Sequence, residues 1–160
     1  MSVYLEDLAV GQVYESGTVA ITADGIKAFA REFDPQPFHL DEAAAQATIF
    51  AGLAASGWYT ASLTMRLLVT GKLHIAGGLV GAGVEEIRWP RPVRPGDVLH
   101  AHSEVVNVRI SQSRPDRGIV RLRTTTLNQD EQAVQMMVAN LMVPRRPHAA
   151  SSPAYESPSQ

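Results

Sequence analysis

The chain has 160 residues, of which 45% are hydrophobic and 19% charged, a composition typical of a globular domain and not of a disordered chain. Its 14 basic and 16 acidic residues give a net charge of −2, without the basic excess of nucleic-acid-binding proteins. The absence of cysteine excludes disulfides, a thiolate nucleophile and cysteine-ligated metals. No apolar run approaches the ~20 residues of a membrane helix, and the N-terminal residues lack a signal-peptide pattern, so we expect a cytoplasmic protein without membrane contact.

The composition changes at one place, after Val143. The residues that follow are rich in proline, serine and alanine and have no apolar periodicity, so they cannot bury enough surface to offset the entropy of ordering. We therefore predict one domain over residues 1–145 and a disordered C-terminal tail over residues 146–160.

Helical patterns occupy the first half of the chain. Thr22 is suited to cap a helix whose apolar residues follow at spacings of three and four. Pro35 and Pro37 end this helix, because proline lacks an N–H and restricts the residue before it. Residues 41–47 are rich in alanine and predict a short second helix.

The longest helical pattern covers residues 56–70 and ends at Gly71, a residue typical of helix C-caps. Its apolar residues lie almost all round the helix, which predicts a buried helix. Runs rich in Val, Ile, Thr and Leu, separated by turn signals, predict five strands. These strands cover residues 13–21, 79–89, 98–110, 119–127 and 133–143. The order predicts an α+β fold, in which an antiparallel sheet packs on one central helix and leaves an edge that dimerisation often covers.

A proline-stiffened turn between the first two helices carries Asp34 and His39. A rigid turn can hold a catalytic pair, and a carboxylate beside an imidazole would orient it and help it to hold a proton. The alternative is structural: Asp34 ends one helix, and His39 or Asp41 caps the next. Spacing alone leaves both interpretations open.

Ser56 and Gly57 lie at the start of the long helix. A helix N-terminus presents unpaired N–H groups and a partial positive charge, and glycine lets another group approach closely, which suits a developing oxyanion. The alternative is that Ser56 is an N-cap and that Gly57 allows tight packing of the helix on the sheet.

Three arginines lie at the end of the second predicted strand and just after it: Arg88, Arg91 and Arg94. They could bind an anionic ligand such as a phosphate. Arginines in such positions are more often solvated or paired with neighbouring acids. Here those acids are Glu85, Glu86 and Asp97.

The other histidines suggest no site. His100 and His102 share one face of a predicted strand, but spacing suggests no third metal ligand. His74 is expected at the surface and His148 in the tail. The sequence lacks a phosphate-binding glycine loop, a G-x-S-x-G motif and an H-E-x-x-H motif. We expect no metal and no redox cofactor.

Three segments together resemble the MaoC-like dehydratases, the family of (R)-specific enoyl-CoA hydratases. They are Asp34-Pro35-Gln36-Pro37-Phe38-His39-Leu40-Asp41, then Ser56-Gly57, then Arg88-Trp89-Pro90-Arg91-Pro92-Val93-Arg94-Pro95-Gly96-Asp97. The resemblance covers about residues 5–145. Two positions depart from the family pattern: Gln36 replaces the usual Asn, and Ser56 stands where many members have His.

The resemblance implies a hot-dog fold, a homodimer or higher homo-oligomer, and a tunnel for an acyl thioester beside the central helix. It implies catalysis by Asp34 and His39, which would hold a water molecule, and an oxyanion hole formed by the N–H of Gly57. We expect Ser56, Ser62, Arg88, Arg91 and Arg94 to bind the substrate, with coenzyme A present only as part of it.

The reaction implied is the reversible addition of water to a trans-2-enoyl thioester. Which of Asp34 and His39 is the base stays open. Two alternatives remain: a hot-dog thioesterase, and a non-catalytic subunit that binds acyl-CoA.

Overall fold

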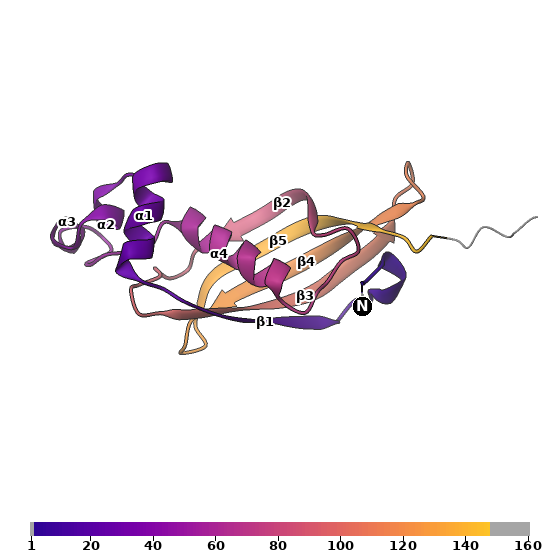
Figure 1. Cartoon of the computed structure of the whole chain (residues 1–160), viewed down its shortest axis with the longest axis horizontal. Helices are drawn as coiled ribbons and strands as arrows, with labels where there is room; N and C mark the ends of the chain where they lie inside the picture. The colour runs from indigo at the N-terminus through magenta and orange to yellow at the C-terminus, as the bar shows by residue number, and fades with distance from the viewer. Residues whose placement is uncertain (1, 148–160) are drawn as a thin grey trace, which may run out of the picture.

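The computed structural model describes residues 2–147, which form one curved five-stranded antiparallel sheet and a group of helices (Figure 1). The strands follow the order β1-β3-β4-β5-β2 across the sheet. In chain order the elements are η1 (Leu5–Asp7), β1 (Val13–Ala20), α1 (Ala23–Phe33), α2 (Pro37–Leu40), α3 (Glu42–Gln46), α4 (Gly57–Thr70), β2 (Val80–Arg88), β3 (Val98–Ile110), β4 (Arg117–Leu127) and β5 (Ala133–Pro144). The predicted α+β arrangement is confirmed.

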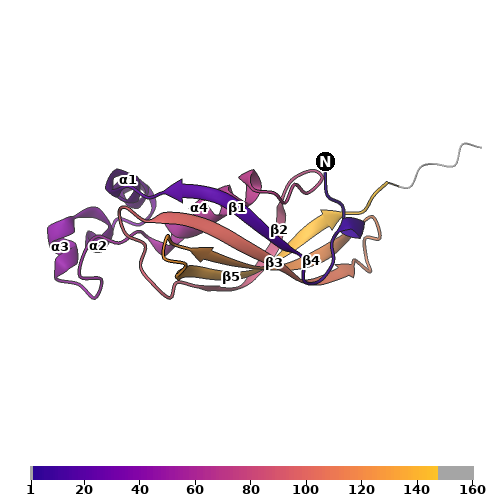
Figure 2. The same cartoon turned by 90° about the horizontal axis from the view of Figure 1, so that it is seen from below.

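The long helix α4 lies along one side of the sheet, as Figure 2 shows. The Ser56 side chain accepts a hydrogen bond from the N–H of Trp58 and so caps the helix, and Gly71 ends it. Both caps agree with the sequence prediction. The strong alternation of buried and exposed residues along β3 and β4 gives the sheet one inner face, and α4 covers part of it.

Two apolar clusters form the core. One joins the helical end of the molecule to the sheet and includes Ile26, Leu67 and Leu99. The other lies toward the opposite end of the sheet and includes Val105 and Leu141. Buried polar side chains also lie on the inner face of the sheet, among them threonines of β4 and a glutamine of β5.

Helices α1, α2 and α3 gather beyond one end of the sheet, next to the start of α4 (Figure 1). Thr22 caps α1 through the N–H of Gly25, as predicted. The predicted turn between the first two helices contains a helical turn of its own, α2, which begins at Pro37. Proline is tolerated at a first helical position, because the N–H it lacks would have no partner there.

The predicted burial of α4 is wrong for one face of the helix. Trp58, Met65 and Val69 are 60%, 46% and 50% exposed, because no other described element covers that side. The edge strand β2 lies next to this exposed face of α4, and its Val84 is 58% exposed. Between α4 and β2 runs an apolar groove of about 280 Å³, which we call the α4–β2 groove.

The last described residues are tied to the first. Arg145 pairs with Glu6 at 2.9 Å, and Arg146 pairs with Asp7 at 2.7 Å. Most of the predicted tail lies outside the described residues. Within residues 2–147, no helix has both the length and the apolar character needed to cross a membrane.

Candidate active site

Asp34 and His39 meet at the junction of α1 and α2. Asp34 is the C-cap of α1, and His39 lies in α2, five residues later. Nε2 of His39 is 3.2 Å from Oδ2 of Asp34, and their side chains are only 6% and 19% exposed. The turn between them therefore points a carboxylate and an imidazole at each other in a sheltered position.

A second contact fixes the orientation of the imidazole. Nδ1 of His39 is 2.6 Å from the carbonyl oxygen of Ala54, which can only accept a hydrogen bond, so Nδ1 carries a proton. Nε2 is then the nitrogen left to face Asp34. The two contacts together hold the imidazole with Nε2 directed at the Asp34 carboxyl group.

Asp34 is held as a carboxylate. Burial raises the pKa of Asp34. Hydrogen bonds from Gln36 and Ser56 and the neighbouring His39 lower it by a larger amount, so the net pKa lies below its usual value. Nε2 of Gln36 donates to Oδ1 of Asp34 at 2.6 Å. Gln36, which replaces the asparagine of the family pattern, thus braces the turn that carries Asp34 in this chain.

The pair lies in a cavity of about 440 Å³, which we call the Asp34–His39 cavity. Residues from four parts of the chain line it: the α1–α2 junction, the segment before α4, the start of α4 and the loop after β2. They include Phe38, Phe50, Ser56, Gly57, Trp58, Thr60, Trp89 and Arg91. Aromatic walls around one acid–base pair make a site suited to a mostly apolar ligand with a reactive polar group.

Gly57 is the first residue of α4 and lies against Trp89. A Cβ placed on Gly57 would be 2.6 Å from Cε2 of Trp89, so only glycine fits beneath this indole. Within residues 2–147, no group accepts a hydrogen bond from the N–H of Gly57. The packing role and the free helix N-terminus, posed as alternatives from the sequence, therefore coexist at this residue.

The structure brings Arg91, but neither of the other two predicted arginines, to the cavity. Arg88 is largely exposed and pairs with Glu86. Arg94 is turned into the protein, where its guanidinium donates to the carbonyl oxygens of Phe50, Gly52 and Leu53. Arg94 thus holds the loop that precedes α4.

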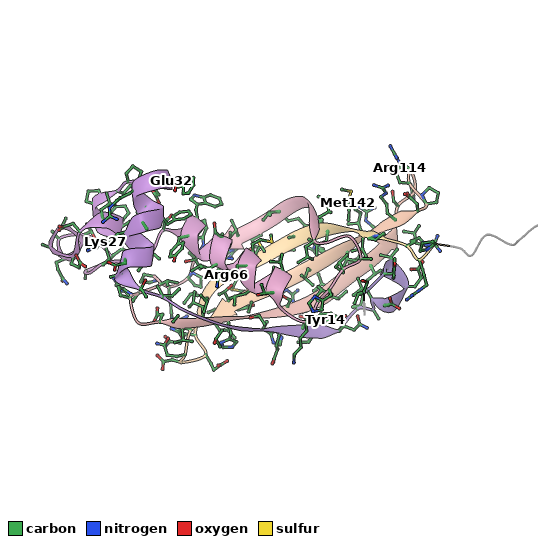
Figure 3. All side chains as sticks on the ribbon, in the orientation of Figure 1. Tyr14, Lys27, Glu32, Arg66, Arg114 and Met142 are labelled. Carbon is green, nitrogen blue, oxygen red and sulfur yellow. The ribbon has the colours of Figure 1, made fainter. Side chains whose placement is uncertain are left out.

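The two predicted serines have different surroundings. Ser56 is 1% exposed, lines the cavity and contributes to the low pKa of Asp34. Ser62 is exposed on α4, and its hydroxyl donates to the carbonyl of Trp58 at 2.8 Å. Ser62 is one turn from the cavity and does not line it. Arg66, one turn further along α4, is likewise exposed (Figure 3).

His74, His100 and His102 do not line the cavity, and His148 lies outside the described residues. His100 and His102 face Glu131 and Glu15 at 3.5 and 3.8 Å. Across the part of the chain that the structure describes, no three His, Asp or Glu side chains converge as metal ligands would.

Sequence reasoning missed the aromatic walls of the site. Trp58 and Trp89 are the only two tryptophans of the chain, and both line the cavity, with ring centroids 5.3 Å apart. Their rarity was a usable signal, because an exposed tryptophan commonly marks a binding surface. Phe50 carried no comparable signal, since only the fold brings it against Phe38.

Solved structures resemble this chain over nearly its full length. A MaoC-like dehydratase from Rhodospirillum rubrum is 54% identical, with a TM-score of 0.89, and the match covers 92% of this chain and 100% of that one. The (R)-hydratase PhaJ1 from Pseudomonas aeruginosa is 28% identical, with a TM-score of 0.69, over 95% of this chain and 94% of that one. The hot-dog fold expected from the sequence is confirmed.

Two curated proteins are similar in sequence. The uncharacterized protein YdeM of Bacillus subtilis is 31% identical over 127 residues, which are 79% of this chain and 89% of YdeM. A mesaconyl-CoA hydratase of Cereibacter sphaeroides is 43% identical over 72 residues, which are 45% of this chain and 21% of that protein. Residues 7–128 match the family described as MaoC like domain. The chain therefore belongs to the MaoC-like domain family.

Proposed function

We propose that this protein is a cytoplasmic hydro-lyase that adds water reversibly to a trans-2-enoyl thioester of coenzyme A and forms an (R)-3-hydroxyacyl thioester. The observation that carries the proposal is the 3.2 Å approach of His39 Nε2 to Asp34 Oδ2 inside a cavity that begins at a helix N-terminus. Similarity to an (R)-hydratase and to part of a mesaconyl-CoA hydratase supports the same reaction class.

In this reaction Asp34 and His39 hold one water molecule between them. The water oxygen forms a bond to C3 of the enoyl group while one O–H bond breaks, and a proton is delivered to C2 through the pair. Because the His39 ring is anchored at Ala54 through Nδ1, Nε2 is the nitrogen that exchanges this proton.

Charge develops on the thioester oxygen as the C3–O bond forms. The N–H of Gly57 at the start of α4 is the donor we assign to this oxygen, and the positive end of the helix dipole favours the same charge. Arg91, which lines the cavity and is exposed, is the arginine we assign to the phosphates of coenzyme A. The reaction as proposed requires no metal or redox cofactor.

We also propose that the protein works as a homodimer. The exposed side chains Trp58, Met65 and Val69 of α4 lie beside the unpaired edge of β2. A second copy would cover both the apolar helix face and the edge strand, two features that single chains rarely leave open.

The function is tested by the loss of enoyl absorbance with crotonyl-CoA. Asp34→Asn and His39→Ala should each lower kcat by about 10²–10⁴, the usual range for general acid–base catalysis. His74→Ala, at an exposed histidine outside the cavity, should retain full activity. Activity that survives both site changes would contradict the site assignment.

Two other outcomes would overturn the reaction itself. Release of free thiol from crotonyl-CoA by the wild-type protein, abolished in the same variants, would indicate a thioesterase. Tight binding of enoyl-CoA esters of several lengths without turnover would indicate a non-catalytic binding subunit.

A further inference from the structure

Two separate hollows lie along α4. The Asp34–His39 cavity reaches along the helix as far as Thr60, whereas the α4–β2 groove begins at Met65 and Leu68. Among the described residues, none lines both hollows. Thr64 lies between them on α4, and at 1.5 Å per residue it is about 6 Å from both Thr60 and Leu68.

A fully buried set of polar side chains fills the interval, and we call it the polar cluster: Thr64, Thr126 and Gln135. All three are 0% exposed. The hydroxyls of Thr64 and Thr126 are 2.7 Å apart, and Nε2 of Gln135 donates to the Thr64 hydroxyl at 3.2 Å. Oε1 of Gln135 accepts from Nε1 of Trp89 at 2.9 Å. The cluster therefore joins α4, β4 and β5 to the indole that packs on Gly57.

The sheet register places this cluster beside the groove. Thr126 is paired with Gln135 across β4 and β5, and the next inward-facing pair is Thr124 with Met137. Thr124 and Met137 line the groove, whereas the Thr126–Gln135 row does not. Because successive inward-facing residues of a strand are about 6.6 Å apart, one row of polar side chains separates the groove from the side of Trp89.

We propose that the polar cluster ends the acyl-binding space and restricts the enzyme to short acyl chains. This inference rests on the proposed function. A chain of four carbons would stay within the Asp34–His39 cavity. A longer chain could reach the apolar α4–β2 groove only by displacing side chains whose buried nitrogen and oxygen atoms each have a hydrogen-bond partner within the protein.

Gln135 also makes the barrier rigid. Its two ends are both engaged, one by Trp89 and the other by Thr64, so the amide cannot rotate without leaving a buried donor or acceptor unpaired. An apolar residue would fill this core position at less cost in desolvation. The contacts of the Gln135 amide explain why a polar residue stands here, since it binds both the indole of Trp89 and the hydroxyl of Thr64.

The first test is the chain-length profile of the wild-type protein. We expect kcat/KM to fall by at least about tenfold between crotonyl-CoA and trans-2-octenoyl-CoA, since binding pockets discriminate by about tenfold or more for each misplaced methylene. A profile that is flat or rises toward octenoyl-CoA would overturn the proposal.

The second test opens the barrier. Gln135→Ala should raise the ratio of kcat/KM for octenoyl-CoA over crotonyl-CoA by at least about tenfold, because the space of the amide joins the cavity to the groove. Gln135→Met keeps the volume but removes the hydrogen bonds that make the barrier rigid, so it should raise the ratio by less than Gln135→Ala does. Met137→Ala enlarges only the groove and should keep the wild-type ratio. A shift with Met137→Ala equal to that with Gln135→Ala would show that the hollows are already continuous.

A binding measurement separates this inference from the proposed function. Isothermal titration should show that octanoyl-CoA binds the wild-type protein no more tightly than butyryl-CoA, but binds Gln135→Ala more tightly. Tighter binding of octanoyl-CoA to the wild-type protein would overturn the barrier, whether or not any enoyl-CoA is turned over. Absence of turnover with this binding pattern intact would instead overturn the hydratase activity. If Gln135→Ala does not fold, Thr64→Ala opens the same interval from the helix side.

Discussion

The two hollows along α4 differ in how their walls are held. Around the Asp34–His39 cavity, Asp34 accepts from Gln36, His39 is anchored on a backbone carbonyl, and Arg94 ties the neighbouring loop through three carbonyls. The α4–β2 groove has apolar walls, and Met65 and Val84 on its rim are about half exposed. Hydrogen bonds within the chain therefore hold the walls of the Asp34–His39 cavity in place, whereas the outer side of the α4–β2 groove is exposed.

This difference fits the tasks proposed for the two regions. A proton-transfer pair needs fixed geometry and defined charge, which hydrogen bonds from the same chain supply. An apolar surface needs only to be removed from water, and a second molecule can do that. Activity should therefore respond to small changes of side-chain size in the Asp34–His39 cavity. Association between copies should respond to changes of polarity in the α4–β2 groove.

Among the changes that test the contrast between the two hollows, the largest effect is expected at Gly57. Gly57→Ala should lower kcat by about 10²–10³, the range for loss of one oxyanion donor, because the added methyl group displaces Trp89 and shifts the start of α4. Gly81→Ala is the matched control in the groove, where a Cβ meets no atom within 4 Å, and it should leave activity unchanged. Equal losses in the two variants would remove the contrast between the hollows.

The next effect concerns the rim of the groove. Val84→Lys should weaken the proposed dimer by at least about tenfold in Kd, because it introduces a charge into a surface that a second copy would bury. Sedimentation velocity at several concentrations measures this change. Ile110→Lys, at an apolar residue that is 53% exposed at the end of β3, should leave the oligomeric state unchanged. A wild-type protein that is monomeric at all concentrations would contradict the dimer.

A smaller effect is expected from the hydrogen bond by which Gln36 braces the Asp34 carboxylate. Gln36→Leu removes one of the hydrogen bonds that lower the pKa of Asp34 and leaves the effect of burial, which raises it. The acidic limb of the kcat/KM profile should move to higher pH. Activity on that limb should fall by up to about tenfold if the limb moves by one pH unit, with little change at pH 8. A profile displaced to lower pH would contradict this role for Gln36.

The smallest effect is expected where the last described residues meet the first, at side chains that line neither hollow. A backbone hydrogen bond from Arg146, with help from Arg145, lowers the pKa of Glu6 to about 2. The stabilisation is present above the usual pKa of 4.5 and is lost as the pH falls toward 2. Glu6→Gln should lower Tm by about 1–2 °C at pH 7 and by less near pH 2, the scale of an exposed ion pair. Glu32→Gln on the surface of α1 is the control (Figure 3).

Short-range sequence patterns predicted most of the elements and the pairing of Asp34 with His39. Thr22, Ser56 and Gly71 mark helix ends because capping depends on residues within one turn. Asp34 and His39 are five residues apart on a turn stiffened by two prolines, so their meeting is decided locally. This is why both could be named before the fold was known.

The same patterns misjudged features that depend on distant segments. The apolar residues all round α4 indicated burial, but only the sheet decides which face is covered, and Met65 and Val69 lie on the open one. Arg88, Arg91 and Arg94 look equivalent in sequence. The structure separates them, because the loop before α4 offers Arg94 three carbonyls and the cavity exposes Arg91.

By itself, the sequence determined the order of the five strands and of the helices α1, α3 and α4, the helix caps, and the turn that joins a carboxylate to an imidazole. Only the tertiary structure decided that Trp89 covers Gly57, that Gln135 holds Trp89 and that Thr64 stands between two hollows. The physical reason is range. Caps and turns are set by contacts over a few residues, whereas Trp89 and Gln135 are 46 residues apart and Thr64 and Gln135 are 71 apart, and they meet only through the register of β4, β5 and β2.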